Sequence, residues 1–303
     1  MPTDIFRAWI RLAIALCTVQ AASAAGDAVP VTAIAVADGV HMLSGRGGNV
    51  AVSSGTDGVL IVDDQYASQY DAIVAAISAI TPAPARFVIN THWHDDHSGS
   101  NAAMSDAGAI IVAHDNVRQR LSSDQVIEFF RSERPAPPPN ALPVITFARD
   151  MTFHFNDDTV HVFHVANAHT DGDAVVHFRT ANVIHTGDVF FNELYPFIDT
   201  GSGGSIGGII AAAEQVLALA DEHTQIIPGH GPLGDKRALE QYVAMLRTVQ
   251  RSIAHLIVSG ATEEQVLLAH PTASFDATWG NGFLGPDRFV RMVYDNIKRE
   301  TLR

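Results

Sequence analysis

The first half of the chain contains short apolar runs that are rich in β-branched residues and separated by Gly, Asp and other polar residues, a pattern typical of strands. These runs lie at 31–36, 49–53, 58–63, 86–90 and 109–113. One segment differs, because residues 67–80 carry Ile73, Val74, Ile77 and Ile80 at helical spacing. The pattern therefore predicts strands with a helix among them.

The second half has the same order of strand-like and helical segments. Its strand-like runs lie at 144–147, 151–155, 159–166, 174–179 and 182–186. A loop rich in Gly and aromatic residues is expected at 189–208, followed by a helix at 209–220, a strand at 224–227 and largely helical sequence to the end. This layout favours an α+β fold in which two mixed β-sheets pack together with helices outside.

A proline-rich segment separates the two halves. Residues 134–143 read ArgProAlaProProProAsnAlaLeuPro, a composition that excludes regular secondary structure. Strand-like runs resume on both sides of it, which favours a surface loop, and a linker between two domains is the alternative.

The composition limits the partners of the protein. The 303 residues are 47% hydrophobic and only 17% charged, enough apolar sequence for a sizeable core in one large domain or two. The formal net charge of −14 argues against a nucleic-acid partner, since phosphate binding needs a basic surface.

The N-terminus has the features of a secretion signal. Arg7 and Arg11 flank the start of an apolar stretch at 8–19, and small residues follow it. That stretch is too short to span a bilayer comfortably. We expect a signal peptide at 1–24 and a mature domain at 25–303 with a helical C-terminal region. The mature protein would be periplasmic or secreted, without stable membrane association.

Cleavage at this point would remove every thiol, because Cys17 is the only cysteine. Disulfides, thiolate nucleophiles and cysteine metal ligands would therefore be excluded from the mature protein. The net charge of the mature chain would be −15, since Arg7, Arg11 and Asp4 leave with the signal.

One short segment concentrates candidate metal ligands. Residues 91–100, ThrHisTrpHisAspAspHisSerGlySer, follow a predicted strand and contain His92, His94, Asp96 and His97. Neutral imidazole and carboxylate both bind metals. Asp95 is expected to be a solvated loop residue, and Trp93 is expected to pack beneath the site.

Three more candidate ligands follow other predicted strands. They are His169 in a turn, Asp188 just past a strand end, and His230 between two glycines. Loops at strand ends gather functional side chains, and a neighbouring Gly lets the backbone turn tightly. The other histidines lie isolated or in ordinary strand alternation, and we expect them to be structural or exposed.

With these motifs the sequence resembles the metallo-β-lactamase superfamily of metal-dependent hydrolases. The resemblance covers about residues 31–235 and rests on matching motifs in the order of the family: ValAspAsp at 62–64, His92-x-His94-x-Asp96-His97, His169, Asp188 and His230. It implies an αββα four-layer sandwich with the metals in a cleft at one edge of the two sheets.

The resemblance also implies a dinuclear centre. It assigns His92, His94 and His169 to a first metal and Asp96, His97 and His230 to a second, with Asp188 bridging both. Two Zn²⁺ ions are the expected cofactors, and iron or manganese would fit similar ligands. Asp63 is interpreted as a supporting residue under the metal loop. A turn aspartate at the end of a strand is the alternative for Asp63.

The expected reaction is hydrolysis of an acyl bond in a small substrate by a metal-bridging hydroxide. Asp96 would orient the nucleophile, and Asp188 would hold the ions together. A β-lactam, lactone, thioester or ester would pass through a similar tetrahedral oxyanion. Since Lys236 and Lys298 are the only lysines, neither can be placed near the site to bind the carboxylate of a drug, and β-lactam hydrolysis is expected to be weak or absent.

Three further functions are compatible with the sequence: a phosphodiesterase, an iron-dependent redox enzyme on the same fold, and a metal-free binding protein. The aromatic loop after Asp188 contributes Phe190, Phe191, Tyr195 and Phe197, which could form the wall of an apolar substrate pocket. Core packing is the alternative for each of these aromatic residues.

Overall fold

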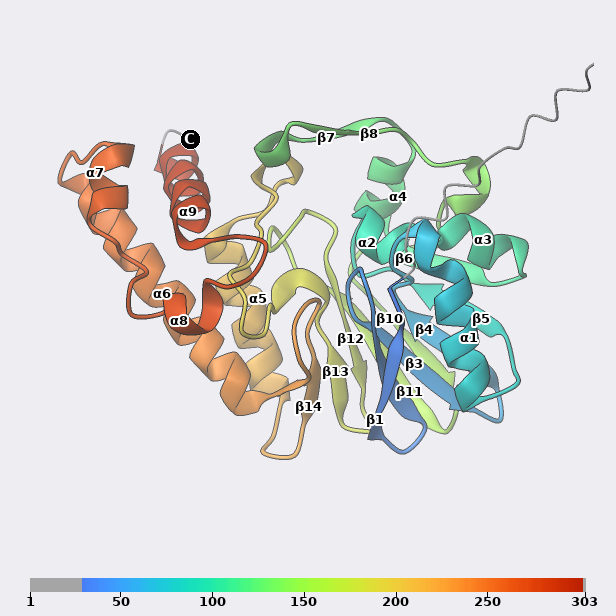
Figure 1. The fold of residues 1–303 in the computed structure, drawn as a ribbon. Coiled ribbons are helices and arrows are strands. Elements are labelled where there is room, and N and C mark those ends of the chain that lie inside the picture. Colours follow the sequence, from blue (N-terminus) through green and yellow to red (C-terminus); the bar gives the residue numbers. More distant parts are fainter. Residues whose placement is uncertain (1–28, 302–303) are drawn as a thin grey trace, which may run out of the picture.

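The computed structural model describes residues 29–301, and the expected signal peptide lies outside this range. The chain folds into four layers, with helices on the outer face of each of two stacked sheets (Figure 1). This arrangement confirms the αββα sandwich predicted from the sequence. Among residues 29–301, no helix combines the length and apolar character needed to cross a membrane.

The first sheet is mixed. Its strands, in spatial order, are β1 (Thr32–Ala37), β2 (Val40–Ser44), β3 (Val50–Gly55), β4 (Gly58–Val62), β5 (Ala85–Ile89), β6 (Ile110–His114) and β9 (Ile145–Phe147). The first four strands form an antiparallel meander, whereas β5, β6 and β9 add to it in parallel.

The second sheet is also mixed. Its strands, in spatial order, are β10 (Asp150–Phe155), β11 (Asp158–His164), β12 (Ala174–Phe178), β13 (Val183–His185), β14 (Gln225–Ile227) and β15 (Gly234–Asp235). Only the β13–β14 pair is parallel. In Figure 1 this sheet lies between the first sheet and the yellow-to-orange helices.

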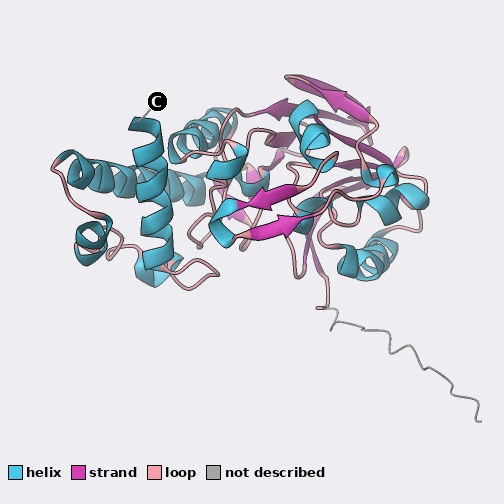
Figure 2. Cartoon of the chain, turned by 90° about the horizontal axis from the view of Figure 1, so that it is seen from above, coloured by secondary structure: helices cyan, strands magenta, loops and turns pink. Residues whose placement is uncertain are grey.

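The outer layers are unequal. The α-helices are α1 (Tyr70–Ile80), α2 (Asp95–Ser98), α3 (Asn101–Asp106), α4 (Asp115–Leu121), α5 (Ile206–Leu219), α6 (Lys236–Val258), α7 (Glu263–Leu268), α8 (Asp276–Trp279) and α9 (Pro286–Thr301). The first four lie beside the first sheet, and the rest form a larger helical region beside the second (Figure 1). Seen from above, the long helices gather at one end of the molecule (Figure 2).

Alternation along the strands explains the layers. On β4, Val59 and Ile61 pack with Ile73 of α1, whereas Leu60 on the opposite face packs against the second sheet. Side chains of a strand point alternately to its two faces, so a strand covered on both sides has to be apolar throughout. The continuous apolar run at 58–63 therefore contains a strand that is buried on both faces.

The proline-rich segment belongs to a single domain. Ala141 within it is buried, and its carbonyl accepts a hydrogen bond of 3.0 Å from Asn101 Nδ2 at the start of α3. Strand β9 follows directly and pairs with β6 of the first sheet. The domain-linker alternative is therefore wrong, because the segment connects β8 (Ser132–Arg134) and β9 on the surface of one structure. The expectation of no regular secondary structure is wrong at Pro139–Ala141, which form a short 3₁₀ helix.

The structure contains a hairpin that the sequence pattern does not predict. Strands β7 (Gln125–Ile127) and β8 (Ser132–Arg134) pair only with each other and are joined by a 3₁₀ turn at Glu128–Phe130. The hairpin runs along the upper side of the molecule in Figure 1, from α4 toward the helical region. It is held at its tip, where Glu128 pairs with Arg299 of α9 at 3.1 Å.

Candidate metal centre

The histidine-rich loop starts where β5 ends and continues into α2. His94 is the N-cap residue of that helix in extended conformation, and His97 lies within its single turn. Two amide–amide hydrogen bonds close the loop, since Asn90 and Asn101 each donate to the other at 3.0 and 2.8 Å. The loop therefore presents its histidines from a fixed backbone.

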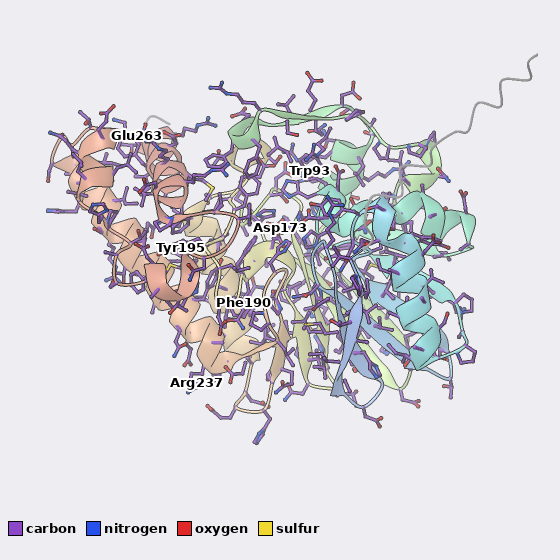
Figure 3. The ribbon with its side chains drawn as sticks, viewed as in Figure 1. Trp93, Asp173, Phe190, Tyr195, Arg237 and Glu263 are labelled. Carbon is purple, nitrogen blue, oxygen red and sulfur yellow. The ribbon has the colours of Figure 1, made fainter. Side chains whose placement is uncertain are left out.

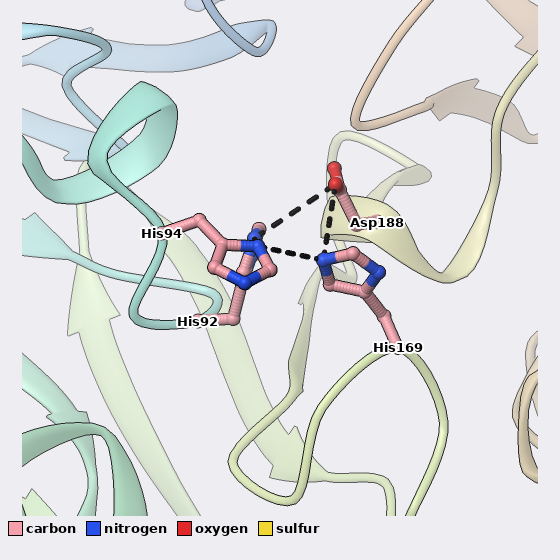
Figure 4. A group of neighbouring side chains, drawn as sticks. All are labelled: His92, His94, His169 and Asp188. Carbon is pink, nitrogen blue, oxygen red and sulfur yellow. Dashed lines mark hydrogen bonds and ion pairs between the residues drawn. The ribbon is translucent and has the colours of Figure 1, made fainter. Parts of the chain in front are cut away.

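Three histidines and Asp188 form the first group of candidate ligands (Figure 4). His94 Nδ1 lies 3.1 Å from His92 Nε2 and 2.9 Å from His169 Nε2. Asp188 Oδ2 lies 3.3 Å from His169 Nε2. All four side chains are buried and converge from three loops.

The outward ring nitrogens of these histidines face oxygen atoms. His92 Nδ1 lies 3.1 Å from Thr91 Oγ1, His94 Nε2 lies 3.0 Å from Asp199 Oδ2, and His169 Nδ1 lies 2.8 Å from the Phe197 carbonyl. An imidazole that donates its proton outward carries a lone pair on the inward nitrogen. The network thus favours tautomers whose lone pairs all point at the space between the rings.

The second group contains Asp96, His97 and His230. His230 Nε2 lies 3.3 Å from His97 Nε2 and 3.2 Å from Asp96 Oδ2. Beneath it, Asp63 Oδ2 accepts from His97 Nδ1 at 2.7 Å, and Asp63 Oδ1 accepts from the Thr91 backbone at 2.7 Å. Asp63 therefore contacts both the loop backbone and a histidine.

Asp188 lies between the two groups. Its Oδ2 faces His169, whereas its Oδ1 lies 3.0 Å from His97 Nε2 and 3.5 Å from His230 Nε2. Oδ1 is buried and makes no contact with hydrogen-bond geometry among residues 29–301. A buried carboxylate oxygen without a donor is costly unless a cation faces it.

Burial and charge set the protonation of the first group. Burial lowers the pKa of His92 well below its ordinary value and lowers the pKa of His169 to about 4. Both imidazoles are therefore neutral at pH 7, which is the form that binds a metal. Burial would raise the pKa of Asp188, but the surrounding imidazoles, His97 first, hold it well below the ordinary value.

The second group holds protons instead. Burial disfavours the charged form of His230, but Asp188 and Asp96 raise its pKa to about 9. The carboxylates of Asp188, Asp96 and Asp63 outweigh burial in the same way and raise the pKa of His97. These protons supply the positive charge that buried carboxylates need, and a metal ion could supply it in their place.

The residues present therefore fit a metal centre. The inward lone pairs of the first group, together with the imidazole and carboxylate groups of the second, form a set of nitrogen and oxygen donors suited to divalent transition metals. Asp96 and His230 are partly exposed on the open side, with side-chain exposures of 22% and 21%. Solvent can consequently reach the second group.

Two supporting residues are not predicted by the sequence pattern. Asp199 contacts His94, as described above, and Asp173 accepts from the His169 and Thr170 backbone amides at 2.6 and 2.8 Å. Burial raises the pKa of Asp173 to about 7. Asp173 holds the turn that carries His169. Its position only four residues after that histidine could have indicated this supporting role from the sequence.

Two of the four aromatic residues predicted to form a pocket wall lie in the core instead. Phe190 packs on Tyr242 of α6, and Tyr195 stacks on Phe289 of α9 at 4.5 Å between ring centroids. Figure 3 shows both on the side of the C-terminal helices. The prediction is therefore wrong for Phe190 and Tyr195, because helices from the C-terminal region bury them in the core.

The other two aromatic residues lie beside the candidate ligands. Phe191 stacks on His230 at 5.1 Å, and the Phe197 ring lies 5.6 Å from that of His169 and 5.9 Å from that of His94. Both are almost fully buried. Both rings shield the imidazoles from water, and Phe197 also contacts Phe130 of the hairpin, with 4.8 Å between the ring centroids.

The neighbours of the ligands in the histidine-rich loop have different roles. Asp95 is half-buried and not simply solvated, since it pairs with Arg134 at the base of the hairpin at 2.9 Å. Trp93 is buried in the hydrophobic core with its ring 4.6 Å from that of His94, as expected.

Solved structures resemble this fold. A metallo-beta-lactamase from Pontibacter korlensis matches with a TM-score of 0.60 at 18% identity, over 72% of this chain and 99% of its own. A mono-zinc metallo-beta-lactamase from Pseudomonas aeruginosa matches with a TM-score of 0.58 at 20% identity, over 74% of this chain and 98% of its own.

A third structure matches more of the chain. A stereoselective inverting sec-alkylsulfatase from Pseudomonas sp. matches with a TM-score of 0.62 at 15% identity, over 88% of this chain. The match covers 50% of the length of that protein. At these identities the likenesses show the fold alone.

The sequence itself identifies the family. Residues 43–233 match the metallo-beta-lactamase superfamily, a range that includes both groups of candidate ligands. Because this match extends over more than half of the chain, the protein belongs to the metallo-beta-lactamase superfamily of metal-dependent hydrolases.

Proposed function

We propose that the protein is a dinuclear zinc hydrolase that cleaves an acyl bond in a small substrate. The observation that carries this proposal is the position of Asp188, whose two oxygens face different groups of ligands. One carboxylate shared in this way suits a pair of neighbouring ions better than a single one. Nitrogen and oxygen donors make zinc the first choice, followed by iron or manganese.

Bound zinc would supply Lewis acidity and an acidic water, which is the chemistry that acyl hydrolysis needs at neutral pH. The residues of the chain supply positioning. Asp96 lies at the open side as a carboxylate, since His97 and His230 outweigh its burial and lower its pKa. It can accept a proton or a hydrogen bond from an attacking water. Asp63 and Asp199 fix the orientation of His97 and His94.

A sulfate ester is a second candidate substrate. The likeness to the sec-alkylsulfatase extends over 88% of the chain, compared with 72% and 74% for the two β-lactamases, and so reaches further along it. Hydrolysis of a phosphodiester and an iron-dependent redox reaction are also compatible with the same set of ligands.

Metal analysis and a substrate panel test the proposal. The purified protein should contain close to two equivalents of metal, mainly zinc. The panel comprises a cephalosporin, a lactone, a thioester, a simple ester, a phosphodiester and a secondary alkyl sulfate. Asp96→Asn should lose turnover, whereas the control Asp71→Asn, at an exposed position of α1, should keep it.

Two results would overturn the assignment. Turnover of only the phosphodiester or the sulfate ester, lost in Asp96→Asn, would replace the acyl substrate while leaving the metal centre intact. One equivalent of iron with an oxygen-dependent reaction would favour a redox enzyme.

We also propose that the protein is exported after removal of residues 1–24. The N-terminal pattern of Arg7, Arg11 and the apolar stretch that follows supports this proposal. The mature N-terminus should lie near Ala25 in the periplasmic or secreted fraction. An intact mass that retains Met1 in the native host would contradict it.

A further inference from the structure

A row of phenylalanine rings leads from the candidate metal centre to the surface. Phe197, beside His94 and His169, lies 4.8 Å from Phe130 of the hairpin, and Phe130 lies 6.3 Å from Phe283. Exposure rises along this row, from 5% for Phe197 through 36% for Phe130 to 54% for Phe283. We call these three residues the aromatic row.

An arginine lies at the outer part of the row. The guanidinium carbon of Arg288, on α9, lies 5.3 Å from the ring centre of Phe130 and 5.4 Å from that of Phe129. Among residues 29–301, Arg288 forms no ion pair with an Asp or Glu. The arginines that do form such pairs are Arg120, Arg134, Arg247, Arg291 and Arg299. Stacking on aromatic rings holds a guanidinium in place while leaving its N–H donors free.

The hairpin that carries Phe130 is anchored at both ends. Glu128 pairs with Arg299 at the tip, and Arg134 pairs with Asp95 at the base, next to Asp96 of the second group. The row is thus assembled from three segments remote in sequence and held in position before any ligand arrives. Preorganised apolar surface of this kind lowers the entropic cost of binding.

We propose that the aromatic row binds the apolar body of the substrate and that Arg288 binds an anionic group at the far end of the same molecule. This inference rests on the proposed function, which places the scissile bond at the metal centre. The substrate class is then an acyl compound with an extended alkyl or aryl body and one terminal anionic group. Exposed aromatic residues beside a reactive centre are typical of a binding surface.

The overall charge disfavours a substrate with many anionic groups. With a net charge of −14, the field of the protein repels polyanions. The aromatic row also explains why Phe130 and Phe283 remain exposed although apolar partners lie close by. A ligand that covered them would remove apolar surface from water.

Binding of hydroxamates tests the proposal without requiring turnover. Hydroxamates chelate zinc, so acetohydroxamate, octanohydroxamate and octanohydroxamate with a terminal carboxylate share one anchor and differ in chain and charge. Their Kd values are measured by calorimetry on the zinc-loaded mature protein. We expect the chain to tighten binding, and the terminal carboxylate to tighten it further.

Two variants and two matched controls show which residues provide the gains in affinity. Phe130→Ala should raise the Kd of both octanohydroxamates by about three- to tenfold, the range for a lost aromatic contact, and leave the Kd of acetohydroxamate unchanged. Arg288→Gln should weaken only the terminal carboxylate compound, by about fivefold as for an exposed ion pair. The controls are Val126→Ala, exposed on the same hairpin, and Arg251→Gln, exposed on α6, and both should bind like wild type.

The outcomes separate this inference from the proposed function. If both variants bind all three hydroxamates like wild type while esters are hydrolysed, the aromatic row is not the binding site and the acyl hydrolase stands. If no acyl compound is hydrolysed but the losses in Kd occur as described, the binding site stands and the proposed reaction is wrong.

Discussion

Single ring nitrogens set the chemistry of the candidate metal centre. His94 turns Nδ1 inward because Asp199 accepts from its Nε2, whereas His97 turns Nε2 inward because Asp63 accepts from its Nδ1. Each buried carboxylate therefore fixes which ring nitrogen of its histidine faces the centre. A change at either carboxylate should be detected as a loss of metal affinity before any change in fold.

Asp199→Ala tests this at the first group. Without the carboxylate, the His94 ring loses its outward acceptor, and affinity for zinc should fall roughly 10- to 100-fold. Competition with a chromophoric chelator measures the affinity. Asp171→Asn is the control, since Asp171 pairs with Arg120 and contacts no candidate ligand. Wild-type affinity in Asp199→Ala would show that Asp199 has no part in orienting His94.

Gly229→Ala should disrupt the centre through a single methyl group. A Cβ at this position would overlap with Asp188 Oδ1 and would lie 2.7 Å from the Gly187 carbonyl group, so the Asp188 carboxylate, the Gly187 backbone or both have to move. We expect the variant to lose turnover and bound metal. Its free energy of unfolding should fall by about 1–3 kcal/mol, as in other overpacked sites.

The control for this change is Gly285→Ala, where a Cβ meets no atom within 4 Å. Metal content and thermal unfolding of the two variants are compared. Equal metal content in Gly229→Ala and wild type would contradict the position given to Asp188.

At the level of elements, one N-cap fixes the start of the longest helix. Asp235 is the N-cap of α6, and its side chain accepts from the Ala238 backbone amide at 2.8 Å. Asp235→Ala should lower the free energy of unfolding by about 1 kcal/mol, the usual cost of a lost cap, whereas Asp235→Ser should keep most of it. Urea denaturation measures both, and equal losses would mean that the cap bond contributes nothing.

The elements that the sequence predicts are those with a strong apolar pattern. Strands β4 and β6 are almost continuous apolar runs, and β5 is apolar after Arg86. The predicted and observed bounds of all three nearly coincide. Strand β2 was missed, because its ValHisMetLeuSer sequence has no period of its own and pairs with β1 and β3 on either side. The hairpin was missed because its short polar strands pair only with each other.

The site residues, too, were predicted where the local sequence is informative and missed where distant contacts decide. Ligand candidates were found because His and Asp at strand ends are conspicuous, and the structure brings all of them together, although metal binding by them stays a prediction. Asp199 was not found, since its partner His94 lies 105 residues away. Phe190 and Tyr195 were misassigned because their burial depends on α6 and α9, which local sequence does not reveal.

At the scale of the whole molecule, one hydrophobic cluster joins the two halves. It contains Trp93 and Val117 from the first half together with Ile184, Leu246 and Phe289 from the second. The metal centre lies where loops from both halves meet. Stability of the halves and occupancy of the centre should therefore be coupled.

Calorimetry with and without chelator tests this coupling. The metal-loaded protein should unfold in one transition, and chelation should lower its Tm, since an ion at 100 times its Kd stabilises the folded state by about 3 kcal/mol. Zinc should restore the Tm. Two separate transitions in the loaded protein would show that the halves unfold independently.

The candidate ligands reach the centre from separate loops, while every strand beneath them keeps its own pairing. This separation makes the chain a modular scaffold for directed evolution. Randomising Phe129, Phe130 and Arg131 of the hairpin turn, while keeping Glu128, which holds the tip of the hairpin, would alter the aromatic surface without touching a hydrogen bond of either large sheet. Libraries aimed at that turn should therefore yield a high proportion of folded variants with altered substrate preference.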